Sequence, residues 1–197
     1  IGGYILSDVP QKPAATEKQI IPQSRLIWAC SHAHLKGYST AERNYLKAAK
    51  HGYRFLIGKF LDEKNGGYFW TTDLNGKVLD DRKILGAQAF VIYGLIEYYR
   101  ASNDKAALHH ATELYHALQQ RAYDKKNGGW SEHFTRDWKP ILQAKPKLQA
   151  KPKYCLVGIA GYKNAENHLH LMEALTELYE VTLDDEVKKS LDEAVSL

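Results

Sequence analysis

Cysteine and long apolar runs are the two features that this sequence has least of. Among its 197 residues only Cys30 and Cys155 are cysteines, which are too few for a disulfide framework or a thiolate zinc site. The start of the chain has no secretory hydrophobic region, and no apolar stretch is long enough to cross a membrane. We therefore expect a cytoplasmic protein without a membrane partner.

Sequence signatures of several functional classes are missing as well. The chain has no glycine-rich phosphate loop, no nucleophile elbow and no cysteine–histidine pairing. Its net charge of +4 owes much to residues 139–153, which contain five lysines, three prolines and no acidic residue. Because no nucleic-acid-binding motif or stacking pattern accompanies these lysines, we expect an extended, solvated loop and no nucleic-acid partner.

The chain does contain enough apolar material for one globular domain. It is 44% hydrophobic and 25% charged, and a chain of this length can bury a substantial core. It is also rich in aromatic residues, with 13 tyrosines and 4 tryptophans. Since these side chains combine an apolar ring with a polar tip, they suit wet clefts and sugar-binding surfaces.

An internal repeat organises the chain. The segment DEKNGGYFW (62–70) matches DKKNGGWSE (124–132), with Asn-Gly-Gly-aromatic in register 62 residues apart. The chain opens on IGGY, so Gly3 is expected to be the remnant of an earlier copy. Each interval has room for two helices, and Asn75-Gly76 predicts the turn of a short β-hairpin between them.

Two of the predicted helices are amphipathic and have one wet face. Residues 39–60 begin with a capping box formed by Ser39 and Glu42, and apolar residues then recur at helical spacing. Residues 103–121 follow the same pattern, with Asn103 as the expected N-cap. These helices are expected to lie on the outside of the fold.

Three other predicted helices are more apolar. Residues 84–101 are apolar nearly all round, which is typical of a helix buried on most sides. Residues 24–36 and 164–181 share this character less completely. Inner helices that alternate with outer ones at a period near 60 residues predict an all-α fold, an α/α toroid with short β-hairpins in its loops and a cleft at its centre.

Both ends of the chain look cut. Residues 184–197 start a new helix with Asp184 as its cap, but no C-cap or terminating glycine follows. At the other end the chain begins inside what is elsewhere a loop motif. We therefore expect residues 1–197 to form a single α/α-barrel domain that is incomplete at both ends.

The segment 163–180 holds the most concentrated set of candidate site residues. On a helix, residues two positions apart point about 200° away from each other, so His168 and His170 lie on opposite faces. Glu166, His170 and Glu173 share one face. No further ligand for a metal is evident nearby, so we expect no metal at this trio. Either this trio lines a catalytic cleft, or His170 and Glu173 are hydrogen-bonded between helices, whereas His168 is expected to pack in the core.

Two other inner helices offer polar candidates. Arg25 stands at the start of residues 24–36 beside Trp28, where it can hold a sugar hydroxyl or an enediolate oxygen, or form an ordinary helix-start salt bridge. Gln88 lies in the apolar helix 84–101 and needs partners if it is buried, so we expect it to face the cleft. Tyr93 is most simply a core residue.

Four motifs in order resemble the N-acylglucosamine 2-epimerase superfamily, most closely its cellobiose 2-epimerase and mannose epimerase/isomerase branch. They are SRLIWACSHAH, GGYFWTTDLNGKVLDDRK, AQAFVIYGLIEYYRAS and HLHLMEALTELYEV. The resemblance runs from about residue 22 to the end. It implies an (α/α)6 barrel, of which this chain is the N-terminal half, and a cofactor-free 2-epimerase or aldose–ketose isomerase. Such an enzyme acts on mannose- or glucose-type sugars, cellobiose-like disaccharides or N-acylglucosamine through ring opening and an enediol.

The same resemblance assigns roles to individual residues. Arg25 matches the family's cleft arginine, His170 the second histidine of its N-x-H-L-H-x-x-E-A pattern, and Glu173 that pattern's glutamate. Glu166 departs from the family, which usually has asparagine there. We therefore take His170 as the catalytic candidate and the following as substrate-binding candidates: Arg25, Trp28, Gln88, Glu166 and Glu173.

Partners and alternative functions follow from the same considerations. The resemblance places the two proton-transfer histidines of the family in the second half of the barrel, so the expected partners are a sugar and that missing half or a partner chain, with a homodimer as a further option. One alternative is a glycoside hydrolase that uses loop carboxylates, which would come from Asp73, Asp80, Asp81, Glu132 and Asp137. The other is a catalytically silent half-barrel that binds glycans or a protein.

Overall fold

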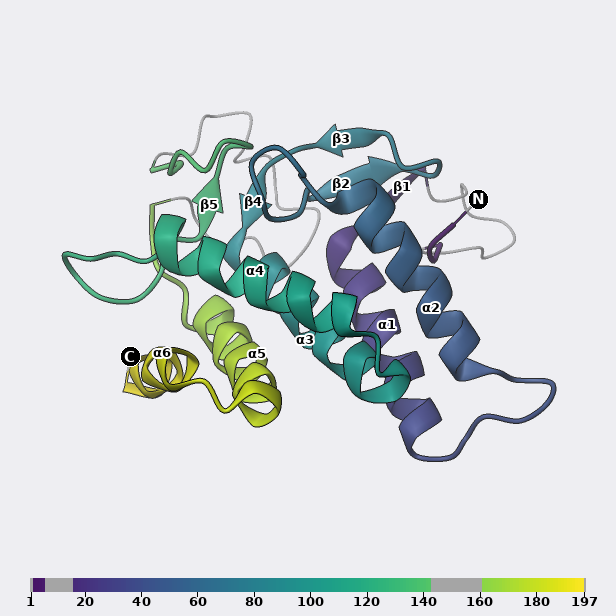
Figure 1. The fold of residues 1–197 in the computed structure, drawn as a ribbon. Coiled ribbons are helices and arrows are strands. Elements are labelled where there is room, and N and C mark those ends of the chain that lie inside the picture. Colours follow the sequence, from purple (N-terminus) through teal and green to yellow (C-terminus); the bar gives the residue numbers. More distant parts are fainter. Residues whose placement is uncertain (1, 6–15, 143–160, 197) are drawn as a thin grey trace.

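The computed structural model describes residues 2–5, 16–142 and 161–196, which form three helical hairpins side by side (Figure 1). The inner helices are α1 (Ile20–Leu35), α3 (Leu85–Ser102) and α5 (Ala165–Thr182). Helix α3 lies in the middle and packs against both α1 and α5. The predicted inner layer is therefore confirmed.

The outer helices each cover an inner one. They are α2 (Tyr45–Phe55), which continues as the π-helical turn η1 (Leu56–Phe60), α4 (Lys105–Arg121) and α6 (Asp185–Ser196). Helix α2 packs on α1, α4 on α3 and α6 on α5 (Figure 1). The alternation of inner and outer helices that the sequence predicted is thus present in all three hairpins.

The inner helices approach each other closely because α3 carries glycine where it meets its neighbours. A Cβ atom on Gly94 would lie 2.7 Å from the backbone oxygen of Ser24 in α1. A Cβ atom on Gly86 would overlap the side-chain amide of Asn167 in α5. Contacts this short leave no room for a side chain, so the two glycines set the spacing of the inner layer.

The outer helices begin later than the sequence predicted. Ser39 and Glu42 do not form the predicted capping box: Thr40 closes a separate turn by accepting a hydrogen bond from Arg43 N at 3.1 Å, and the Ser39 hydroxyl accepts from Tyr45 N at 3.3 Å. Helix α2 starts at Tyr45, where the side chain of Asn44 accepts from the backbone N–H of Lys47. The capping residue is therefore Asn44.

The boundary between α3 and α4 differs from the prediction in a similar way. Asn103 has a left-handed backbone (φ 55°) and ends α3, while the side chain of Asp104 caps α4. Asparagine tolerates this conformation better than most residues, which favours it at the end of a helix. The predicted cap of the last helix is confirmed, since Asp184 accepts from the N–H of Glu186 at 2.7 Å.

The short strands lie at the N-terminal ends of the inner helices (Figure 1). Strands β1 (Glu17–Gln19), β2 (Thr71–Asp73) and β3 (Val78–Asp80) form an antiparallel sheet. The predicted hairpin joins β2 to β3, and Gly76 has the positive φ of 94° that its turn requires. Strands β4 (Lys83–Ile84) and β5 (His133–Phe134) form a second antiparallel pair.

The repeated Asn-Gly-Gly segments fold into the same loop twice. Asp62 N–H donates to Gly67 O, and Asp124 N–H donates to Gly129 O. In each loop the aspartate side chain also accepts from the asparagine three residues later. The repeat seen in the sequence is therefore a repeat in structure.

Each loop is fastened to the fourth residue of the inner helix that follows it. Gln88 accepts from Tyr68 N–H at 2.8 Å and donates to Tyr68 O at 2.9 Å. Gln23 bonds both backbone groups of Tyr4 in the same way, and His168 Nε2 accepts from Trp130 N–H at 3.2 Å. We call Gln23, Gln88 and His168 the clamp residues. The opening Gly-Gly-Tyr is thus held by its inner helix in the same way as the two loops.

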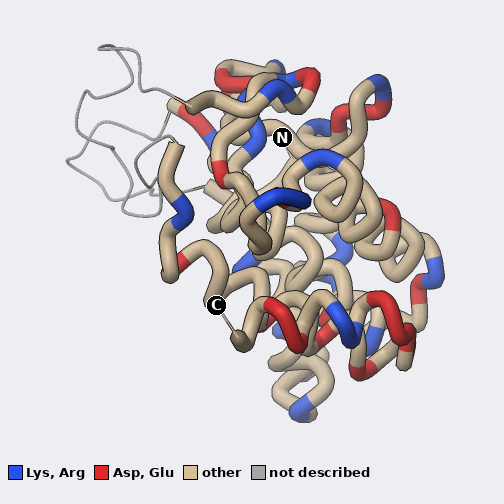
Figure 2. The backbone as a smooth tube through the Cα atoms, turned by 90° about the vertical axis from the view of Figure 1, so that its left-hand side faces the viewer, with Lys and Arg blue, Asp and Glu red and all other residues tan. Residues whose placement is uncertain are grey.

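Some expectations concern features outside this core. None of the described helices combines the length and hydrophobicity of a membrane span. Most of the lysine-rich segment 139–153 falls in residues 143–160, which lie outside the described part of the chain. On the side of the molecule in Figure 2, acidic and basic residues are interspersed.

Candidate functional site

A cavity of about 790 Å³ opens between the three inner helices. Its lining residues come from α1, α3 and α5, and six of them occupy equivalent positions. Two positions after the clamp residues stand Arg25, Phe90 and His170, and five positions after them stand Trp28, Tyr93 and Glu173. Residues three apart share one face of a helix. The clamp residues therefore set two levels of side chains along the cavity, one formed by the residues two positions after the clamps and the next by the residues five positions after them.

His170 and Glu173 form a pair in this cavity. His170 Nδ1 lies 2.9 Å from Glu173 Oε2, and the imidazole ring is 4.4 Å from the ring of Phe90. When Nδ1 carries the proton and donates it to this carboxylate, Nε2 holds a lone pair. The pair can therefore present a base to a molecule in the cavity. Glu166 lines the same cavity one turn earlier on α5.

Arg25 reaches the cavity from α1 and is exposed. Its guanidinium carbon lies 5.6 Å from the ring centroid of Phe90. Within the described residues Arg25 has no ion pair, so the alternative of a helix-start salt bridge is not found there. A free guanidinium beside an aromatic ring is suited to holding an oxygen that bears negative charge.

Trp28 and Tyr93 make an aromatic wall. Their rings stack with centroids 5.1 Å apart and planes 11° from parallel. Burial, together with the nearby carboxylates of Glu177 and Glu173, raises the pKa of Tyr93 to about 12. The phenol of Tyr93 therefore keeps its proton near neutral pH and acts as a hydrogen-bond donor.

Tyr93 and Phe90 are cavity residues that the sequence reasoning missed. Helix α3 is apolar nearly all round, so its composition marks no cavity-facing side. A usable signal was present nonetheless, because both residues stand at the same distance from Gln88 as Trp28 and Arg25 stand from Gln23.

Gln88 does not line the cavity, contrary to the prediction that it faces the cleft. Its side chain is 1% exposed and both of its amide atoms bond the backbone of Tyr68. The predicted packing role of His168 is confirmed: the residue is 7% exposed, and its ring nitrogens bond Trp130 N and Asn164 O. The structure therefore brings together Arg25, Trp28, Glu166, His170 and Glu173.

The loop carboxylates serve local structure and do not line this cavity. Asp80 pairs with Arg82, Asp73 accepts backbone bonds in the β2–β3 turn, and Asp137 pairs with Lys139. Glu132 is buried, which raises its pKa, although bonds from Asn164 and Asn167 oppose the rise. This arrangement does not favour a glycosidase. Within the described residues no three His, Cys, Asp or Glu side chains are grouped to hold a metal ion.

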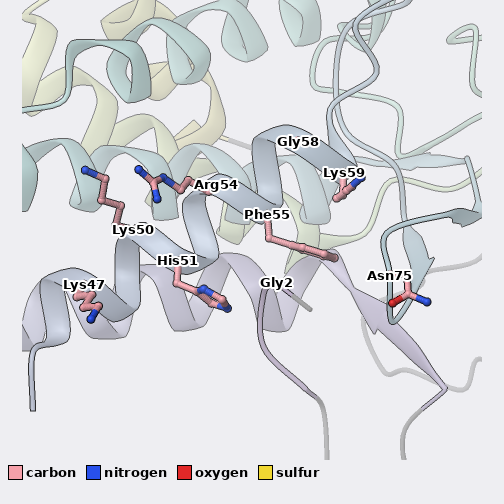
Figure 3. Close-up of a pocket in the computed structure, with 9 residues that line it drawn as sticks. All are labelled: Gly2, Lys47, Lys50, His51, Arg54, Phe55, Gly58, Lys59 and Asn75. Atoms are coloured by element: carbon pink, nitrogen blue, oxygen red, sulfur yellow. The ribbon is translucent and has the colours of Figure 1, made fainter.

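A second pocket, of about 400 Å³, lies on the outer layer beside α2 (Figure 3). It surrounds Phe55, and its ionisable lining residues are basic: Lys47, Lys50, His51, Arg54 and Lys59. None of the candidate site residues lines it. The inner cavity is therefore the candidate active site.

Comparison with known proteins identifies the family of this chain. The sequence model of the N-acylglucosamine 2-epimerase (GlcNAc 2-epimerase) family matches residues 2–197. Cellobiose 2-epimerase of Dictyoglomus turgidum is 33% identical over 199 residues, which cover 100% of this chain and 48% of that enzyme. D-mannose isomerase of Thermobifida fusca is 27% identical over 164 residues, which cover 81% of this chain and 34% of that enzyme.

A solved structure shows the same similarity in three dimensions. Cellobiose 2-epimerase from Bacillus thermoamylovorans matches with a TM-score of 0.83 at 30% identity, over 100% of this chain and 48% of its own. This chain thus spans about half the length of the cellobiose 2-epimerases that it resembles. Its three helical hairpins are part of an (α/α)6 barrel, and the chain belongs to the N-acylglucosamine 2-epimerase family.

Proposed function

We propose that this chain carries the sugar-binding part of a sugar 2-epimerase or aldose–ketose isomerase. The observation that carries the proposal is the convergence of His170, Arg25 and the aromatic wall on one cavity, in a chain similar to cellobiose 2-epimerases. Aromatic rings suit the C–H faces of a sugar, and charged or amide groups suit its hydroxyls. The candidate substrates are mannose- or glucose-type sugars, cellobiose-like disaccharides and N-acylglucosamine.

The reaction requires proton transfer at the carbon next to the aldehyde. After the ring opens, a base removes the proton on C2, and the electron pair left behind forms the C1=C2 bond while O1 becomes the oxyanion of an enediolate. Return of a proton to the opposite face of C2 gives the epimer. Return to C1, with transfer of the proton on O2 to O1 as the C2=O2 bond forms, gives the ketose.

The cavity residues match these demands. His170, oriented by Glu173, offers Nε2 to take or hold a proton at the sugar. Arg25 stabilises the negative charge that develops on O1. Tyr93 donates a hydrogen bond to a sugar oxygen, because its phenol stays protonated. Glu166 accepts from a hydroxyl at the edge of the cavity.

Isotope exchange tests this function directly. The full-length protein is incubated in D2O with mannose, glucose, cellobiose or N-acetylglucosamine, and NMR detects the epimer, the ketose and deuterium at C2. The expected result is a new isomer that carries deuterium at the carbon that received the proton. Sugar binding without exchange would instead favour a silent glycan-binding half-barrel.

We also propose that the edge formed by α5 and α6 is covered in the complete enzyme, by a further part of the barrel or by a partner chain. Leu169 and Val195 on this edge are 48% and 65% exposed, and they line a pocket of about 390 Å³ with Met172 and Ala194. Exposed apolar side chains grouped in this way are typical of a covered surface. A homodimer and a cytoplasmic location stay predictions from the sequence.

A further inference from the structure

A polar network joins the three inner helices below the cavity. Nine positions after the clamp residues stand His32 on α1, Glu97 on α3 and Glu177 on α5. His32 Nδ1 lies 2.7 Å from Glu97 Oε1. The guanidinium of Arg100 donates to the other oxygen of Glu97 at 3.2 Å and pairs with Glu177. Glu97 is only 4% exposed, so both of its oxygens are held in a buried site.

The same network reaches the aromatic wall through His32. The imidazole of His32 stacks on Trp28 with centroids 4.7 Å apart and planes 9° from parallel. Trp28 in turn stacks on Tyr93. The indole Nε1 of Trp28 is buried and has no hydrogen-bond partner in the described part of the chain. Stacking is therefore what the structure provides to fix the plane of this indole.

We propose that Glu97 is a positioning residue of the sugar site, acting through His32 on Trp28. The bond from His32 Nδ1 to the carboxylate fixes the rotation of the imidazole ring, and Arg100 fixes the carboxylate. The oriented imidazole then holds Trp28 parallel to Tyr93, which keeps the wall flat where a sugar would lie. The effect on sugar binding rests on the function proposed above, whereas the effect on the plane of Trp28 does not.

The experiment follows Trp28 itself. Near-UV circular dichroism and fluorescence spectra are recorded for each protein and for the same protein carrying Trp28→Phe. The difference between the two spectra is the signal of Trp28. The variants are Glu97→Gln, His32→Phe and the two combined, since phenylalanine can stack on the indole without a hydrogen bond. Glu180→Gln is the matched control, because Glu180 pairs with Arg100 at 2.7 Å but does not touch His32.

We expect Glu97→Gln to change the Trp28 signal and to weaken sugar affinity about tenfold, as removal of one bond to a charged group does. When His32 is already replaced by Phe, Glu97→Gln should cause little further change in the Trp28 signal or in sugar affinity, because the hydrogen bond that links Glu97 to the ring beside Trp28 is no longer present. Glu180→Gln should leave the Trp28 signal unchanged. Thermal melting of every variant separates these effects from a loss of folding.

Three results decide the proposal. If Glu97→Gln lowers the melting temperature but leaves the Trp28 signal as it was, Glu97 only joins helices and the proposal is overturned. If the signal changes while the parent protein neither binds nor converts a sugar, the positioning role stands and the proposed function fails. Should Glu97→Gln not fold, His32→Leu decides: it removes the ring from a side chain that is 40% exposed, and an unchanged Trp28 signal would overturn the proposal.

Discussion

Gln88 and His168 occupy the same position on two inner helices, and each holds the backbone of a Gly-Gly-aromatic loop. One is an amide and the other an imidazole, yet both place an acceptor at the N–H of the aromatic residue. Because each loop is held at the same place on its helix, the residues two and five positions later reach the cavity from α1, α3 and α5 alike.

Replacing Gln88 should affect stability and spare the sugar site. Gln88→Ala leaves the N–H and C=O of Tyr68 buried and unpaired, which should lower the free energy of unfolding by about 2–4 kcal/mol. Urea titration measures this loss, and calorimetry with a sugar measures affinity in the folded protein. A loss of affinity without a loss of stability would instead return Gln88 to the substrate-binding residues.

Replacing His170 should instead lower activity and leave stability largely unchanged. His170→Asn removes the imidazole that Glu173 orients, and the rate of epimer or ketose formation should fall at least about 100-fold, as it does when a general acid–base group is lost. His109→Asn is the matched control, because His109 is exposed on the outer helix α4. Equal rates for the two variants would exclude a role for His170 in proton transfer.

The two copies of the Asn-Gly-Gly loop allow a controlled test of a buried ion pair. Lys83 and Asp62 are 2.9 Å apart with side chains 0% and 1% exposed, so Asp62→Asn leaves a buried cation unpaired and should lower stability by about 3–5 kcal/mol. Asp124→Asn makes the same change in the other loop, where Lys163 and Asp124 are partly exposed. Its loss should be much smaller. Equal losses in urea unfolding would contradict this account.

Asp62 also makes stability depend on pH at the acid end. Burial alone would raise its pKa, but hydrogen bonds from Asn65, Lys83 and Arg136 hold the pKa well below its usual range. The folded state therefore binds fewer protons than the unfolded state, and the stabilisation is present above the unfolded pKa of about 4 and lost as the pH falls below it.

His133 should make stability depend on pH in a range above that of Asp62. Burial, with the nearby charge of Arg82, lowers its pKa to about 4, and both ring nitrogens lack partners in the described part of the chain. The unfolded state takes up the proton first, so stability should fall by about 3 kcal/mol between pH 6.5 and pH 4. In His133→Phe this part of the decline should be absent. Urea unfolding at several pH values measures this decline, and equal slopes in the two proteins would mean that His133 takes up its proton as readily in the folded state as in the unfolded state, which contradicts this account.

The sequence predicted the parts of the site that depend on one helix at a time. The 100° step of a helix is enough to separate His170 from His168, and the resemblance of SRLIWACSHAH to the family is enough to mark Arg25. Tyr93 was assigned to the core because an all-round apolar helix gives no clue to which side meets a cavity. Gln88 was assigned to the cleft because its partner, the backbone of Tyr68, belongs to a loop twenty residues away.

The predicted starts of two outer helices were wrong for a related reason. Ser39 and Asn103 are good capping residues by type, but another residue of this kind follows each of them, and these later residues, Asn44 and Asp104, are the ones that cap. Thr40 closes a local turn, and Asn103 takes the left-handed conformation that ends α3. Such competition between neighbours is settled by packing of the helices, which single-residue preferences do not contain.

The clamped loops have a consequence for how this cavity distinguishes molecules. The scaffold repeats three times, but the side chains that it delivers do not: one level carries arginine, phenylalanine and histidine, and the next carries tryptophan, tyrosine and glutamate. A row of equivalent positions with unlike occupants has no internal symmetry. Under the proposed function, a sugar that is turned over or shifted by one helix would therefore meet a different set of neighbours, although the framework around it is nearly uniform.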